Sequence, residues 1–240
     1  MTPKDSADEH PPFLNSSDTI ALGPYQEMLD PGAVVLRGFI GEQATALLDT
    51  IRTIEDGSPF RHMITAGGFR MSAALTNCGS LGWVSDHHGY RYSSTDPLSG
   101  KPWPAMPTLF SHLACRAASA AGYAGFTPDA CLINRYAPGA RMTLHRDDSE
   151  HAFGAPIVSL SLGLSVSFQF GGLERSSPLR RPPLHHGDAV VWGGPARLRY
   201  HGVLPLKNGV HPVTGAFRIN LTFRHAGIPD HHDGSRPIHP

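Results

Sequence analysis

The chain has 240 residues, and its 20 lysines and arginines equal its 20 aspartates and glutamates, so the formal net charge is zero at neutral pH. This balance excludes a general electrostatic attraction to nucleic acid, and a nucleic-acid site has to be a local patch. The polar start and the lack of a long apolar run predict neither a signal peptide nor a membrane span, and the odd count of three cysteines favours reduced thiols. We therefore expect a cytoplasmic protein.

From the N-terminus, residues 1–18 are polar and have no hydrophobic period, which predicts a disordered lead-in. Residues 33–39 form an apolar run and predict an early strand. Residues 41–56 and 107–121 carry apolar side chains at helical spacing. We expect two amphipathic helices there, which pack as scaffold.

Between these helices, residues 57–106 are rich in glycine, aromatic and basic side chains without a clear period. Trp83, Tyr90 and Tyr92 stand among the basic residues, and such a mixture can hold phosphates and stack nucleic-acid bases. An ordinary surface excursion with buried aromatic side chains explains this composition equally well. Because a structureless segment of this length is uncommon in a compact domain, we expect an irregular lid or binding element.

From residue 130 onward, short apolar runs alternate with glycine and proline, the pattern of a sandwich or barrel of strands. The predicted strands cover residues 130–136, 141–145, 156–164, 166–170, 188–192, 200–205 and 216–223. The predicted fold class is mainly β with flanking helices, a double-stranded β-helix or jelly roll, in one domain over residues 19–226 with its core at 130–224. The histidine-rich residues 227–240 favour a disordered tail over a metal site.

These strands carry a candidate metal site. His145 and Asp147 are two residues apart, so in a strand both side chains leave on the same face. With His201 from a later strand they match a facial triad of two histidines and one carboxylate, which leaves positions on Fe(II) for a bidentate cosubstrate and O2. A chance His-x-Asp pair is the alternative in a sequence with 15 histidines, and on the dipeptide alone it is the more frequent outcome.

The strand over residues 216–224 carries a candidate anion site. Apolar and polar side chains alternate along it, which predicts a half-buried strand whose polar face holds Arg218 and Arg224. Arginine is suited to bidentate capture of a carboxylate, although an edge strand with a solvated face is the alternative. The two arginines are roughly 20 Å apart along an ideal strand, so they reach one small dicarboxylate only if their side chains lean together or the strand bends.

Six longer runs are more specific than these patterns: Met71-Ser72, Thr76–Gly79, Lys101–Pro107, Ala130–Ala140, Phe168–Gly172 and Arg218–Arg224. With them the chain resembles the AlkB family of Fe(II)- and 2-oxoglutarate-dependent dioxygenases. The resemblance implies the jelly-roll fold and the use of Fe(II), 2-oxoglutarate and O2.

The resemblance also implies roles for individual residues. The implied iron ligands are His145, Asp147 and His201, which with Arg224 form the catalytic centre. The implied 2-oxoglutarate residues are Asn134, Tyr136, Arg218, Asn220 and Arg224, with Arg218 at the distal carboxylate and Arg224 beside the carboxylate that chelates iron. The implied substrate contacts are Thr65, Trp83, Tyr90, Tyr92, Ser149 and Arg175, with Trp83 stacked on a flipped base opposite His145.

One position departs from the family pattern. Bacterial members place an aspartate two residues after the iron-binding aspartate, near the exocyclic amine of the bound base. This chain has Ser149 there, so the family's base preference does not carry over.

The resemblance implies oxidative removal of alkyl groups from 1-methyladenine and 3-methylcytosine, with release of formaldehyde, succinate and CO2. The implied partner is alkylated single- or double-stranded DNA, with RNA as a further substrate, and neither a membrane nor a second subunit takes part. One alternative is the same iron chemistry on RNA, protein or a small molecule. The other is a catalytically silent jelly-roll binding module.

Overall fold

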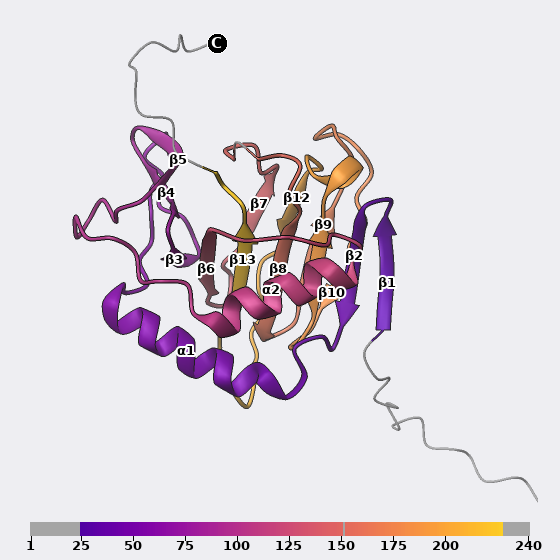
Figure 1. Cartoon of the computed structure of the whole chain (residues 1–240), viewed down its shortest axis with the longest axis horizontal. Coiled ribbons are helices and arrows are strands. Elements are labelled where there is room, and N and C mark those ends of the chain that lie inside the picture. The colour runs from indigo at the N-terminus through magenta and orange to yellow at the C-terminus, as the bar shows by residue number, and fades with distance from the viewer. Residues whose placement is uncertain (1–24, 151, 228–240) are drawn as a thin grey trace, which may run out of the picture.

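Two antiparallel β-sheets lie face to face in the computed structural model, which describes residues 25–150 and 152–227 (Figure 1). The larger sheet contains, in spatial order, β1 (Tyr25–Asp30), β2 (Ala33–Arg37), β11 (Ala189–Trp192), β8 (Ile157–Gly163), β13 (Arg218–Arg224), β6 (Ala130–Tyr136) and β3 (Ala74–Gly79). The smaller sheet contains β10 (Pro183–Leu184), β9 (Val166–Phe170), β12 (His201–Val203) and β7 (Met142–His145). A separate hairpin pairs β4 (Gly82–Asp86) with β5 (Gly89–Ser93).

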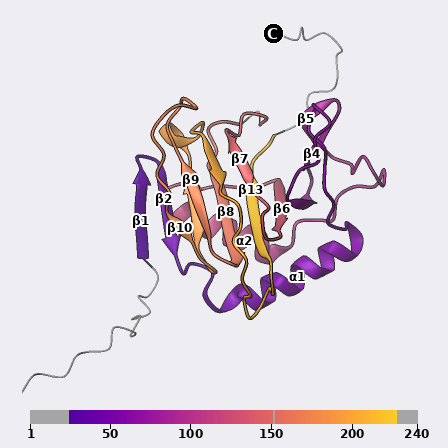
Figure 2. The ribbon, with the colours of Figure 1, turned by 180° about the vertical axis from the view of Figure 1, so that it is seen from behind.

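Two helices, α1 (Ala44–Gly57) and α2 (Thr108–Ala120), cover the outer face of the larger sheet. Figure 2 shows the opposite side, where the smaller sheet lies in front of the larger one. The apolar stripes of both helices and the apolar face of β13 belong to one buried cluster, and Phe110 packs edge-on against Phe223. Because the apolar face of β13 packs against the helices, its polar face points into the space between the two sheets.

A second apolar cluster fills part of that space. It joins Val35 and Ile157 of the larger sheet to Phe168 and Leu184 of the smaller one, with Trp192 beside Phe168. A short 3-10 helix, Gly41–Gln43, precedes α1. A second one, Gly194–Ala196, lies between β11 and β12. No helix in residues 25–150 and 152–227 is long and apolar enough to cross a membrane.

The predicted fold class, both predicted helices and the seven predicted strands after residue 130 are confirmed. The prediction of a half-buried strand at 216–224 is wrong, because all seven residues of β13 are buried between two neighbouring strands. The lead-in at residues 1–18 lies outside the described residues, as does the tail beyond Gly227.

The prediction that residues 57–106 are irregular is also wrong, because they contain β3, β4 and β5. All six residues of β3 are buried, and its polar side chains bond inward, so the strand lacks the alternation that would reveal it. The Asn77 amide accepts from the backbone N–H of Trp83 and donates to the Trp83 carbonyl, both at 3.0 Å. A polar side chain of β3 therefore ties the hairpin β4–β5, called the lid hairpin below, to the larger sheet.

Candidate active site

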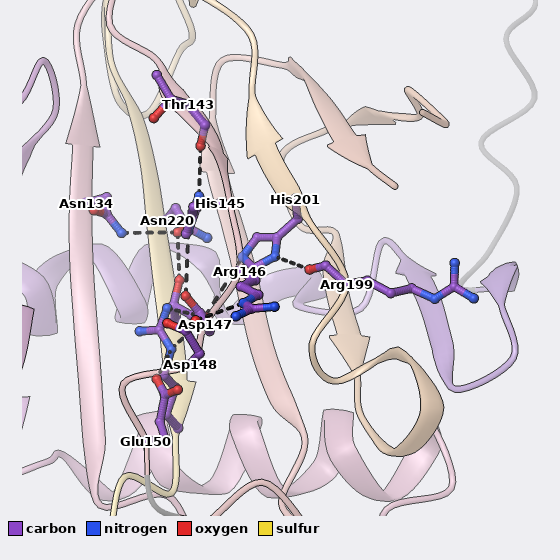
Figure 3. A network of polar contacts seen from close by, with 12 residues as sticks. Asn134, Thr143, His145, Arg146, Asp147, Asp148, Glu150, Arg199, His201 and Asn220 are labelled. Atoms are coloured by element: carbon purple, nitrogen blue, oxygen red, sulfur yellow. Dashed lines mark hydrogen bonds and ion pairs between the residues drawn. The ribbon is translucent and has the colours of Figure 1, made fainter. Parts of the chain in front are cut away.

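Three side chains of residue types that can bind a metal converge at the inner face of the smaller sheet (Figure 3). His145 ends β7 and His201 begins β12, and the two residues are direct partners across these antiparallel strands. Asp147 follows β7, with Oδ1 3.6 Å from Nε2 of His145 and Oδ2 3.9 Å from Nε2 of His201. One donor atom from each residue lies within 4.8 Å of the others, which is the spacing of ligands around one ion.

Both imidazole rings are oriented by backbone carbonyls. Nδ1 of His145 lies 2.8 Å from the Thr143 carbonyl, and Nδ1 of His201 lies 3.0 Å from the Arg199 carbonyl. Because a carbonyl oxygen only accepts, each Nδ1 donates to its carbonyl, and this bond turns each Nε2 toward the site. Burial, together with His145, lowers the pKa of His201 to about 4, so that ring is neutral and able to bind a metal. This is the arrangement that orients metal-ligating histidines in proteins.

The carboxylate of Asp147 is ionised in spite of its burial. Burial opposes ionisation, but Arg224 and the two histidines hold the pKa of Asp147 well below its usual range. Arg224 donates to Oδ2 from Nη2 at 2.6 Å and from Nε at 2.9 Å. Two imidazoles and one carboxylate are the donor set of an open Fe(II) centre, so these residues fit an iron ion.

A cavity of about 640 Å³ connects this cluster to the polar face of β13. Arg218 lies in its wall with 2 % exposure, and it donates to the Ser161 hydroxyl at 3.0 Å. Within the described residues it has no carboxylate partner, its buried Nε has no hydrogen-bond partner, and burial lowers its pKa. A buried cation without a counter-ion is costly, so this end of the cavity fits an anionic ligand.

The other predicted cosubstrate residues surround Arg218. Tyr136 is its direct partner across β6 and β13, and Asn134 is the direct partner of Asn220. The Asn134 amide donates to Asn220 at 3.3 Å, while its buried Oδ1 has no partner. The cavity therefore offers a cation and polar groups at one end and the metal cluster with Arg224 at the other. This arrangement fits a small dicarboxylate such as 2-oxoglutarate without requiring both arginines to reach one carboxylate.

Comparison with known proteins agrees with this donor set. Residues 32–224 match the model of the 2OG-Fe(II) oxygenase superfamily. The alpha-ketoglutarate-dependent dioxygenase AlkB of Salmonella typhimurium is 61 % identical over 203 residues, which span 85 % of this chain and 94 % of that protein. The chain belongs to the AlkB family of 2OG-Fe(II) oxygenases. It is therefore an Fe(II)- and 2-oxoglutarate-dependent dioxygenase, and a catalytically silent binding module is not favoured.

Two more distant relatives extend the comparison. The nucleic acid dioxygenase ALKBH1 of Mus musculus is 32 % identical over 123 residues, or 51 % of this chain and 31 % of the mouse protein. The solved structure of OsALKBH1 has a TM-score of 0.74 at 27 % identity, over 83 % of this chain and 99 % of that one. This AlkB-family chain therefore has the jelly-roll fold of the 2-oxoglutarate oxygenases.

The lid hairpin of this AlkB-family enzyme contributes two aromatic rings to the cavity. Trp83 of β4 and Tyr90 of β5 both line it, with ring centroids 5.4 Å apart and planes inclined by 19°. Thr65 and Ser149 line the same cavity. Four of the six predicted substrate residues are therefore brought together around the cavity that His145, Asp147 and His201 also line.

The other two predicted substrate residues lie elsewhere. Arg175 is exposed and outside the cavity wall, with its guanidinium 5.3 Å from the centre of the Tyr200 ring. Tyr92 belongs to the lid hairpin but does not line the cavity, because its hydroxyl donates to Glu150 at 2.6 Å. The position of Arg175 outside the cavity wall therefore does not support its predicted contact with substrate.

Sequence reasoning did not assign several residues of the cavity wall to the site, and three of them are exposed aromatic or basic residues. Phe69, which is 77 % exposed, and the exposed Arg70 and Arg141 all line the cavity. An aromatic side chain next to a basic one after the Gly67-Gly68 turn is the signal that could have found the first two. Arg141 precedes β7 and has no distinctive sequence pattern around it.

Proposed function

We propose that this enzyme oxidatively removes alkyl groups from nucleic-acid bases, with DNA containing 1-methyladenine or 3-methylcytosine as its substrate. The observation that carries the proposal is the aromatic pair Trp83–Tyr90 in the wall of the cavity that contains the metal donors. Planar aromatic side chains stack on bases, and an alkyl group on N1 or N3 makes the base cationic, which strengthens its attraction to an aromatic face. The activity named for the ALKBH1 relative supports the same substrate class.

The chemistry requires an oxidant because a methyl group on a ring nitrogen has no leaving group that hydrolysis could use. When bound, Fe(II), 2-oxoglutarate and O2 supply the oxidation of a methyl C–H bond to C–OH, with 2-oxoglutarate converted to succinate and CO2. The resulting hydroxymethyl base loses formaldehyde and regains its pairing edge. In this proposal His145, Asp147 and His201 hold the iron, and Arg218 holds the distal carboxylate of the cosubstrate.

The protein also has to admit the base and exclude water. A base reaches the cavity only after it leaves the helical stack, which costs a few kcal/mol and least for unpaired or lesion-weakened bases. Ser149 lies in the cavity wall, where its hydroxyl can both donate and accept a hydrogen bond, whereas a carboxylate only accepts. Adenine and cytosine both carry an exocyclic amine from which this hydroxyl can accept, so we infer that Ser149 permits either base. We further infer a cytoplasmic enzyme, in keeping with its free cysteines, that acts as a monomer, since the metal donors, Arg218 and the aromatic pair line one cavity of the same chain.

The test is formaldehyde and succinate release from matched oligonucleotides that contain one 1-methyladenine or 3-methylcytosine, as single-stranded DNA, duplex DNA and RNA, with the unmethylated oligonucleotide as control. We expect turnover on methylated single-stranded DNA and only background on the control. Faster turnover on RNA would favour the alternative substrate. No formaldehyde from any methylated nucleic acid would overturn the proposal.

A further inference from the structure

A buried carboxylate beside the metal cluster has no role in holding iron or cosubstrate. Glu150 follows Asp147 by three residues and is 4 % exposed. Its Oε1 lies 3.1 Å from Nε of Arg224, and its Oε2 lies 3.1 Å from Nη2 of Arg197, a residue that is 3 % exposed. Glu150 therefore joins two buried arginines, and with Asp147 the four side chains balance two negative against two positive charges.

Both arginines also hold Asp147, each at a different point. Arg224 binds the side-chain oxygen Oδ2, and Arg197 donates from Nη1 to the backbone carbonyl of Asp147 at 2.8 Å. These contacts fix the carboxylate plane and leave Oδ1 directed at His145, 3.6 Å from its Nε2. Because Glu150 restrains both arginines, it restrains the metal-binding carboxylate from two sides.

Glu150 also binds the lid hairpin. Its Oε1 accepts the Tyr92 hydroxyl at 2.6 Å, and the Tyr92 ring packs on a small buried cluster of Leu81, Ala130 and Ala226. Tyr92 is the direct cross-strand partner of Trp83, the aromatic residue in the cavity wall. One carboxylate oxygen is therefore shared between the arginine that holds Asp147 and the strand pair that holds Trp83.

We propose that Glu150 is a positioning residue that couples the lid hairpin to the metal-binding carboxylate. When a base binds against Trp83, the lid hairpin is held in place, and Tyr92 holds Glu150, Arg224 and Asp147 in the geometry that binds the metal. Base binding and metal binding then strengthen each other, because coupling between two sites is reciprocal. The inference rests on the proposed function for the identity of the base, but its metal-binding part does not.

The test is a titration of the full-length chain with Co(II), followed by its visible absorption, in the presence of 2-oxoglutarate and with or without a methylated single-stranded oligonucleotide. We expect the oligonucleotide to tighten Co(II) binding by about fivefold in the wild-type protein, the low end of typical coupling. In Tyr92→Phe the oligonucleotide should change Co(II) affinity less than twofold. Tyr123→Phe is the matched control, because that hydroxyl donates to the Gly32 carbonyl at 2.8 Å outside the cavity, and it should retain the full coupling.

Glu150→Gln tests the metal-binding part without nucleic acid. It removes the charge that restrains both arginines, and we expect Co(II) binding to weaken by about tenfold with no oligonucleotide present, the loss expected when a group that orients a metal ligand is removed. Coupling that persists in Tyr92→Phe, or unchanged Co(II) affinity in a folded Glu150→Gln protein, would overturn the inference. If Glu150→Gln does not fold, Tyr92→Phe decides. If the wild-type enzyme shows no turnover on methylated DNA but Glu150→Gln binds Co(II) more weakly than the wild type, the proposed substrate is wrong and the role of Glu150 stands.

Discussion

Replacing Arg218 tests the cosubstrate pocket through two measurements, because the change should weaken 2-oxoglutarate binding without lowering the stability of the fold. Its guanidinium is 2 % exposed, and no carboxylate of the described residues pairs with it. Arg218→Met keeps most of the side-chain volume and removes the charge. Without 2-oxoglutarate the variant should be at least as stable as the wild type, because replacing a buried charge by a packed apolar group is neutral or stabilising.

The cosubstrate should bind much more weakly to the same variant. Removing one partner of a buried, hydrogen-bonded charge pair costs about 2 to 5 kcal/mol, and about 1.4 kcal/mol is a factor of ten in affinity. The Kd for 2-oxoglutarate should therefore rise by at least about 30-fold. Calorimetric titration with 2-oxoglutarate in the presence of Mn(II) and the absence of O2 measures the Kd, and urea unfolding without 2-oxoglutarate measures the stability.

Arg37→Met is the matched control for Arg218→Met. Arg37 is 9 % exposed and pairs at 2.6 Å with both Asp188 and Glu27, outside the cavity. Its replacement leaves Asp188 buried without that partner, so it should destabilise the fold by about 3 to 5 kcal/mol and leave the Kd unchanged. If Arg218→Met loses stability as Arg37→Met does while its Kd stays constant, Arg218 is a structural residue and the reasoning is wrong.

Two further predictions concern the lid and the response to acid. Trp83→Ala should raise the KM for a methylated oligonucleotide by about tenfold, since stacking on an aromatic ring contributes about 1 to 3 kcal/mol per base. Co(II) titration of the same variant should show unchanged metal binding. Lost metal binding would contradict the assignment of Trp83 to the substrate. Burial alone would raise the pKa of Asp96. The hydrogen bonds from Arg61 and from the Leu98 N–H together lower it by more than burial raises it, so the pKa of Asp96 lies below its usual range. The stability from Asp96 is thus present above about pH 4 and lost as the pH falls through the depressed value. Asp96→Asn should be less stable than the wild type at pH 7 in urea unfolding, and the difference should shrink below pH 4; a constant difference would refute this.

The strand β13 shows what the alternation of apolar and polar residues can and cannot predict. Alternation along residues 216–224 predicted a strand, and Arg218 and Arg224 were correctly grouped on one face. The same alternation could not reveal that β13 lies inside a seven-stranded sheet, where helices cover one face and the cavity adjoins the other. Both faces of β13 are buried, so the strand is neither half-buried, as the alternation predicted, nor an edge strand with a solvated face, the alternative.

Two other features could not be predicted from local sequence. β3 escaped detection because Thr76 and Asn77 are buried polar residues, satisfied by Ser58 and by the Trp83 backbone, so its pattern resembles a loop. Arg197 follows a Gly-Pro-Ala turn and bonds the Asp147 carbonyl from 50 residues away. Contacts of this kind depend on the tertiary fold, whereas His145 and Asp147 are two residues apart and left a short-range signal.

The central claim is that His145, Asp147 and His201 bind one metal ion. Anomalous diffraction from crystals grown anaerobically with Mn(II) tests it directly. We expect one strong peak within about 2.0 to 2.3 Å of Nε2 of both histidines and a carboxylate oxygen of Asp147, the range of metal–ligand distances in proteins. Asp86, His87 and His88, of which only the two histidines are exposed, also bring three donor atoms within 4.8 Å, although Arg91 already binds the Asp86 carboxylate. A sole peak at that group, or at any place away from His201, would contradict the account.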